Sequence, residues 1–145
     1  MTEIVILDAG PLGLISRPAP SLEIMAWFAR LVVAGTMVCI PEIADFEVRR
    51  ELLRAGKFKG LKRLDQLKAT LRYLPITTEA MLKAAEFWAD ARKHGRQTAH
   101  DQALDADMIL AAQAATCSMT SVVIASMNPR HLSRFVAAEN WEDIK

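Results

Sequence analysis

The stretch IVILDAGPLG, from Ile4 to Gly13, decides the fold. Its first four residues are an unbroken apolar run that contains β-branched side chains, which is typical of a strand buried on both faces of a parallel sheet. The run stops at Asp8, and Gly10, Pro11 and Gly13 are expected to break regular structure after it. The sequence therefore opens with a buried strand whose carboxyl end carries an acidic residue.

The remainder of the chain alternates between helical and extended patterns. The expected elements are a helix over 22–34, a strand over 37–40, helices over 41–55 and 61–71, an extended stretch over 73–76, a helix over 78–94, a helix through Leu104 to Ala115, a strand over 121–125 and a closing segment past Pro129. Strands separated by helices need crossover connections, which place helices on both faces of a sheet. We therefore predict an α/β fold with three layers, α/β/α, and a mostly parallel central sheet.

Length and composition indicate one globular domain spanning residues 1–145. The chain has 145 residues, of which 52% are hydrophobic, and this is enough apolar material for a sizeable core. Its 18 Lys and Arg against 17 Asp and Glu leave a net charge of +1, so any site for a polyanion must be local. No signal peptide or membrane-spanning segment is visible, and the two cysteines form no metal-binding pattern, so we expect a cytoplasmic protein without membrane contact.

Four polar residues stand where a parallel sheet places its ligands, beyond the carboxyl ends of the strands. Asp8 directly follows the first strand and Asn128 follows the last one. Asp107 is expected at or near the start of the helix that leads into that last strand, and Glu47 lies inside the helix after the second strand. Each also has a simpler interpretation, since aspartates cap turns and helix starts, and Glu47 could pair with Arg50 or Arg54.

Clustered carboxylates repel one another unless a cation neutralises them. Oxygen ligands favour Mg²⁺ or Mn²⁺ over zinc or copper. A metal held by carboxylates can activate a water molecule and offset charge on a phosphodiester. The set therefore points to hydrolysis of a phosphodiester.

Four segments together resemble PIN domains, and most closely their toxin-type branch called VapC. They are Ile6 to Gly13, the run IPEIADFEVRREL around Glu47, Asp105 to Ala112, and Ser126 to Leu132. The resemblance implies that Asp8, Glu47 and Asp107 are metal-binding acids and that Asn128 occupies the fourth catalytic position. It further implies that Asp105 is an auxiliary metal ligand.

The same resemblance implies a Mg²⁺- or Mn²⁺-dependent endoribonuclease that is the toxin of a toxin–antitoxin pair, with RNA as substrate, an antitoxin protein as partner and a homodimer as its assembly. Two positions depart from the pattern: Ala9 stands where many relatives have Ser or Thr, and Ser126 stands where Thr is commoner. Ala9 and the neutral Asn128 keep open an alternative, a non-catalytic PIN-like module that binds RNA or protein. Loss of metal binding would be its signature.

A local excess of basic residues begins directly after Glu47. Between residues 49 and 68 eight Lys and Arg are opposed by two acids. A polyanion held there would pass close to the predicted metal site, although a solvated helix face gives the same pattern. With the resemblance, this excess predicts RNA-binding residues at Arg49, Arg50, Arg54, Lys57 and Lys59.

Overall fold

A computed structural model of the chain describes residues 3–94, 101–119 and 121–145. Its centre is a five-stranded sheet in the order β3-β2-β1-β4-β5, in which every pair of neighbouring strands is parallel. The strands are β1 (Ile4–Leu7), β2 (Met37–Pro41), β3 (Arg72–Leu74), β4 (Val122–Ser126) and β5 (Ala138–Asn140). The predicted parallel sheet is confirmed, with the opening strand in the middle.

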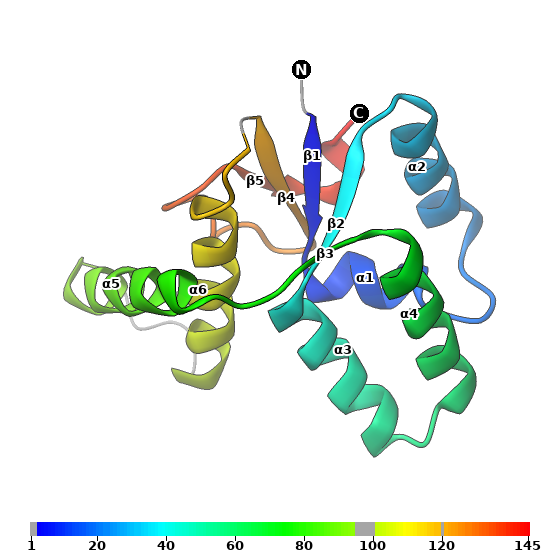
Figure 1. The fold of residues 1–145 in the computed structure, drawn as a ribbon, viewed down its shortest axis with the longest axis horizontal. Coiled ribbons are helices and arrows are strands. Elements are labelled where there is room, and N and C mark those ends of the chain that lie inside the picture. Colours follow the sequence, from blue (N-terminus) through cyan, green and yellow to red (C-terminus); the bar gives the residue numbers. More distant parts are fainter. Residues whose placement is uncertain (1–2, 95–100, 120) are drawn as a thin grey trace.

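Helices cover both faces of this sheet, as predicted. They are α1 (Ala9–Ile15), α2 (Leu22–Val33), α3 (Glu42–Arg54), α4 (Phe58–Thr70), α5 (Thr78–His94), α6 (Asp101–Ala115) and the short 3₁₀ helix η1 (Trp141–Asp143). In Figure 1, α5 and α6 lie to the left of the sheet, whereas α1 to α4 lie below it and to its right. The fold is therefore a three-layer α/β/α arrangement. None of the described helices is long and apolar enough to cross a membrane.

The alternation of side chains along β1 explains why two layers of helices are needed. Val5 and Leu7 pack into one hydrophobic cluster with residues of α1, α2, α3 and α4. Ile4 and Ile6 point to the opposite face and pack with residues of α6. All four side chains are buried because successive residues of a strand face opposite sides of the sheet. The unbroken apolar run is thus the sequence signature of a central strand.

The prediction that regular structure breaks after Asp8 is wrong, since Ala9 to Ile15 form helix α1. The Asp8 carboxylate caps this helix by accepting a hydrogen bond from the Ala9 N–H at 2.7 Å. Pro11 lies in the first helical turn, where a backbone N–H has no partner within the helix, so proline is tolerated there. Burial of Leu12 and Ile15 then outweighs the low helix propensity of the two glycines.

Two buried polar side chains fix α3, which carries Glu47. Asp45 accepts hydrogen bonds from Arg49 of the same helix and from the Tyr73 hydroxyl of β3, the latter at 3.0 Å. The Gln113 side chain of α6 accepts from the Ile43 N–H at 3.3 Å and donates to the Leu74 carbonyl at 2.8 Å. The start of α3 is therefore tied to β3 and to α6, the helix that carries Asp107.

Candidate metal centre and nucleic-acid groove

The strand order places a crevice at the end of β1. The chain first extends the sheet from β1 to β2 and β3, and it later returns to add β4 on the other side of β1. In parallel α/β sheets such a reversal opens a ligand crevice at the carboxyl ends of the two strands involved. Asp8 follows β1 at this point, and Met127 and Asn128 follow β4. The position predicted for Asp8 is thus the topological switch point of the sheet.

A hydrogen-bonded chain orients the Asp8 carboxylate. The Ser126 hydroxyl donates to Asp8 Oδ2 at 2.7 Å, and the same hydroxyl oxygen accepts from the Asn128 N–H at 3.0 Å. Ser126 is only 1% exposed, so its hydroxyl has little access to water. Serine replaces the commoner threonine at this position but retains the hydroxyl group. This hydroxyl links Asp8 to the loop after β4.

This contact gives a first prediction. In Ser126→Ala, Asp8 Oδ2 and the Asn128 N–H lose their shared partner, so the carboxylate should be less well oriented. Outer partners of this kind are typically worth about 10- to 100-fold in metal affinity or activity. We expect a loss of that size in Mg²⁺ affinity, measured by titration calorimetry, whereas Ser126→Thr should bind as the wild type does. Equal affinities in all three proteins would show that the hydroxyl does not position Asp8.

Glu47 is half-buried on α3, and its surroundings disfavour its charge. Burial, and then the charge of Asp8, raise the pKa of Glu47 from 4.5 to about 7; Arg50 opposes this shift and Asp107 adds to it. Within the described part of the chain, neither Arg50 nor Arg54 forms an ion pair with Glu47, and Arg54 pairs instead with Glu51 at 2.8 Å. The simpler interpretation, a surface glutamate in a helical ion pair, therefore does not hold.

Asp107 belongs to the same electrostatic cluster. Burial, and then the charge of Asp8, raise the pKa of Asp107 from 3.8 to about 6. It lies inside α6 and not at its start as expected, because the helix begins at Asp101. Asp8, Glu47 and Asp107 come from three separate parts of the chain, and the raised pKa values show that each of the latter two feels the charge of Asp8.

Asp8, Glu47 and Asp107 suit a hard cation that keeps some of its water molecules better than a cation enclosed by protein ligands alone. In the described residues, no three acidic, histidine or cysteine side chains stand close enough to hold an ion by themselves. Mg²⁺ usually keeps several of its waters and binds through one or two carboxylates, so it does not need such a cage, unlike structural zinc. Burial and repulsion by Asp8 disfavour the ionised forms of Glu47 and Asp107, and a cation between these acids would favour those forms. The donor set therefore suits Mg²⁺ or Mn²⁺.

Three other predicted site residues lie in different surroundings. Asn128 is exposed beside Asp8 at the end of β4, so it stands at the predicted place. Asp105 is exposed and lies two residues before Asp107 on α6, which turns it about 200° away around the helix. Its predicted role as an auxiliary ligand is not supported by this position. Arg49 forms ion pairs with Asp45 and Asp65 on a face of α3 outside the groove described next.

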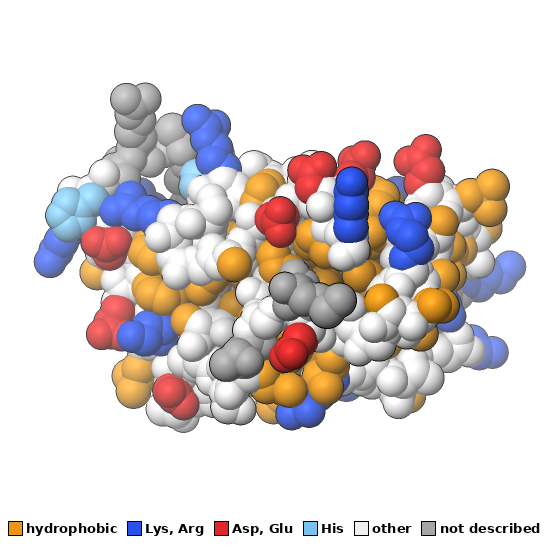
Figure 2. Space-filling view, turned by 90° about the horizontal axis from the view of Figure 1, so that it is seen from above, with side chains coloured by type: hydrophobic (Ala, Val, Ile, Leu, Met, Phe, Trp, Pro, Cys, Tyr) orange, Lys and Arg blue, Asp and Glu red, His pale blue; other side chains and the backbone are white. Residues whose placement is uncertain are grey.

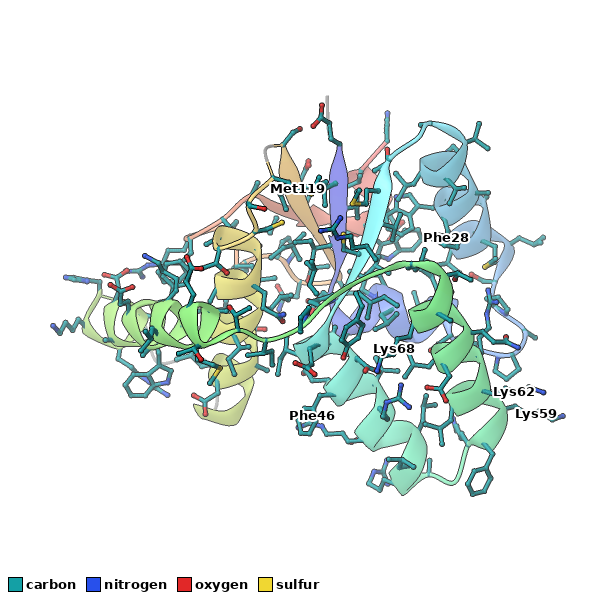
Figure 3. All side chains as sticks on the ribbon, viewed as in Figure 1. Phe28, Phe46, Lys59, Lys62, Lys68 and Met119 are labelled. Atoms are coloured by element: carbon teal, nitrogen blue, oxygen red, sulfur yellow. The ribbon has the colours of Figure 1, made fainter. Side chains whose placement is uncertain are left out.

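A groove of about 1310 Å³ leads away from Glu47. One wall is α1 with the loop after it, and the other is the end of α3 with the start of α4. Four of the five predicted RNA-binding residues line it, namely Arg50, Arg54, Lys57 and Lys59, together with Arg17 from the opposite wall. Figure 3 shows Lys59 and Lys62 projecting outward from α4. The basic segment thus forms one side of a groove whose lining includes Glu47 of the acidic cluster.

The opposite end of the molecule differs in character. Figure 2 looks onto the end where β1 begins, and it shows acidic and basic side chains scattered among hydrophobic ones. This agrees with the net charge of +1, which leaves no general positive field. The concentration of cations along the groove is therefore a local feature, as the sequence predicted.

Sequence reasoning missed three residues that line the groove: Arg17, Phe58 and Met127. Met127 covers the first turn of α1 so closely that a Cβ at Gly10 would lie 2.8 Å from its sulfur. The signal for Met127 was its place directly before Asn128. Arg17 and Phe58 had no signal, because only the packing of α1 against α3 brings the two walls together.

Chains in several solved structures have the same fold as this chain. The FitAcB complex from Neisseria gonorrhoeae contains a chain that matches with a TM-score of 0.70 and 23% identity, covering 97% of this chain and 99% of that one. The structure of FitAB bound to an IR36 DNA fragment matches with a TM-score of 0.72 and 25% identity, covering 97% of both chains.

VapBC2 from Rickettsia felis, bound to a promoter DNA fragment, matches with a TM-score of 0.72 and 14% identity, covering 95% of this chain and 98% of that one. The chain has a PIN-like fold. The resemblance drawn from its motifs is therefore confirmed in structure, over nearly the whole chain. No protein-family model and no curated protein sequence matches it. The PIN-like fold thus rests on structure and on the four motifs.

Proposed function

We propose that this protein is a Mg²⁺- or Mn²⁺-dependent endoribonuclease and the toxin of a toxin–antitoxin pair. The single observation that carries the proposal is the coupled set Asp8, Glu47 and Asp107, of which Glu47 lines a basic groove. The named neighbours FitAB and VapBC support the toxin assignment. The same likeness supports an antitoxin partner. The proposal also includes a homodimer, which the resemblance of the motifs to PIN domains implies.

The chain's own residues would hold and orient the reacting groups. Asp8, fixed by Ser126, and the carboxylates of Glu47 and Asp107 would bind the cation, with the neutral Asn128 beside them. When bound, the metal would lower the pKa of a water and offset charge on the phosphodiester. Glu47 and Asp107 take up protons more readily than ordinary carboxylates, so they must release them before a cation is held.

The groove would hold the RNA backbone. Its cations would contact successive phosphates, and the residues that begin α4 form part of its wall. The N-terminal end of a helix carries a partial positive charge, and the first turn of α4 contains no acidic residue that would neutralise it. A phosphate chain running along this wall would approach Glu47 at the near end of the groove.

The direct test is cleavage of a mixed pool of labelled RNAs by purified, partner-free protein with Mg²⁺ or Mn²⁺. We expect cutting that EDTA abolishes. Cutting that persists in EDTA would contradict the metal dependence. Binding of RNA without any cutting or metal binding would instead favour the non-catalytic module, whose motivation is Ala9 and the neutral Asn128.

The groove assignment gives a second prediction, on salt dependence. In single-stranded RNA each neutralised phosphate contributes about 0.7 to the slope of log K against log salt. Replacing Lys57 and Lys59 with alanine should lower that slope by about 1.4, measured by fluorescence anisotropy in EDTA. Lys93→Ala is the matched control, because Lys93 is an exposed cation on α5, on the other side of the sheet. An unchanged slope in the double variant would place the RNA elsewhere.

A further inference from the structure

We propose that Phe58 is a platform on which an unpaired base stacks, so that the groove selects single-stranded RNA. This inference rests on the proposed function and adds the conformation of the substrate to it. Phe58 is the first residue of α4, it lines the groove, and it is 75% exposed. An aromatic ring so exposed between two lysines, Lys57 and Lys59, is the combination that single-strand binding uses.

The backbone under Phe58 is firmly held. Helix α3 ends with Gly56 in the left-handed region, at a φ of +67°. The Gly56 N–H donates to the Leu53 carbonyl at 3.1 Å, and the Lys57 N–H donates to the Leu52 carbonyl at 2.9 Å. These bonds close the end of α3 in a Schellman-type turn, and α4 starts directly after it. The backbone from which the Phe58 ring projects is therefore held in place.

Close packing of α3 against α4 adds to this rigidity. Gly60 is buried against Leu52, and a Cβ at Gly60 would lie 2.9 Å from a methyl carbon of that leucine. The two helices therefore approach each other at the first turn of α4, directly beside Phe58. A platform held in this way loses little freedom when a base stacks on it.

The charges around Phe58 favour a nucleic acid over an apolar peptide. The groove is lined by five cations, whereas its acids are Glu47 at one end and Glu51, which is already paired with Arg54. A phosphate backbone complements this surface, and its bases supply the flat faces that an aromatic ring binds. In a duplex those faces are stacked on one another, so only an unpaired base can reach the ring.

The length of α3 between Glu47 and the turn before Phe58 indicates where that base lies in the substrate. Along α3, Glu47 and Arg54 are seven residues apart, which corresponds to about 10 Å of helix. At about 3.4 Å per stacked nucleotide this spans roughly three nucleotides. The base on Phe58 would therefore belong to a nucleotide several positions from the scissile phosphate, and Phe58 is a positioning residue for cleavage.

The experiment compares binding of a single-stranded oligoribonucleotide that contains 2-aminopurine with binding of its duplex, in EDTA, by anisotropy and by 2-aminopurine fluorescence. Phe58→Leu keeps an apolar side chain and loses the stacking face, whereas Phe58→Trp keeps the face. We expect Phe58→Leu to weaken single-strand binding about tenfold and to abolish the fluorescence quenching that stacking causes. Phe58→Trp should bind as the wild type does, and duplex binding should stay unchanged. Leu53→Ala is the control, an exposed apolar residue of α3 outside the groove lining.

Equal single-strand binding by wild type and Phe58→Leu would overturn the stacking role. If Phe58→Leu instead impaired only the binding of a partner protein, the groove end would be a protein-docking site and the proposal would be wrong. Wild-type cleavage in Mg²⁺ is measured in parallel. If the wild type cuts RNA and Phe58→Leu binds it as the wild type does, this inference fails and the proposed nuclease stands. If the wild type cuts no RNA, the proposed nuclease fails.

Discussion

Asp8→Asn should lower metal-dependent RNA cleavage by on the order of 100-fold or more while leaving the fold intact. Asp8 is the residue whose charge is felt by both Glu47 and Asp107. Removing that charge takes away a ligand and weakens the attraction for a cation. The asparagine side chain keeps an oxygen that can accept a hydrogen bond from the Ala9 N–H, so the cap of α1 survives.

Initial rates at saturating Mg²⁺ would measure the effect, and the thermal midpoint would check the fold. The matched control is Asp105→Asn, which neutralises an exposed acid two residues from Asp107 on the same helix. Because Asp105 is exposed and lies about 200° from Asp107 around α6, its variant should cleave within about twofold of the wild type, as surface changes usually do. If Asp8→Asn cleaved RNA at the wild-type rate, the acidic cluster would have no part in the mechanism. If Asp105→Asn lost most of its cleavage activity, Asp105 would be a metal ligand.

The sequence predicted the layers and most elements because their signals are local. The run Ile4 to Leu7 predicts a strand buried on both faces, and the helix predicted over 78–94 is observed as α5, with Thr77 as the residue that caps it. Helix α1 was missed because its glycines and proline argue against a helix, whereas a cap by Asp8 and burial of Leu12 overrule them. The short edge strand β5 was also missed, since three residues carry too little periodicity to detect.

Some residues of the candidate site could likewise be predicted from the sequence, and others could not. Asp8 and Asn128 could be predicted because parallel strands present their carboxyl ends at one edge. Arg49 could not be separated from Arg50 by sequence, since the two differ only in which face of α3 they occupy. Arg49 faces Asp45 and Asp65, whereas Arg50 lines the groove. Arg50 also lies 5.1 Å from the ring centre of Phe46, which is not part of the groove lining. Figure 3 shows Phe46 on the side of α3 away from α4.

Stabilisation by Mg²⁺ should depend strongly on pH and should appear mainly above pH 7. The pKa of Glu47 is raised to about 7 and that of Asp107 to about 6, mainly by burial and then by the charge of Asp8. For a carboxyl group whose pKa is higher in the folded state, the contribution to stability is complete below its unfolded pKa and declines as pH rises through the folded value. The metal-free protein should therefore lose stability between about pH 4 and pH 7.

A bound cation reverses this trend, because it favours the ionised carboxylates and its binding releases their protons. At free Mg²⁺ about ten times the dissociation constant, the thermal midpoint at pH 8 should rise by roughly 5 °C, and at pH 5 it should hardly move. Scanning fluorimetry with and without Mg²⁺ across this range measures the difference. Glu47→Gln removes the group with the higher pKa, so its metal-free stability should vary less with pH. A midpoint shift of the same size at pH 5 and pH 8 would mean that Mg²⁺ binds away from Glu47 and Asp107.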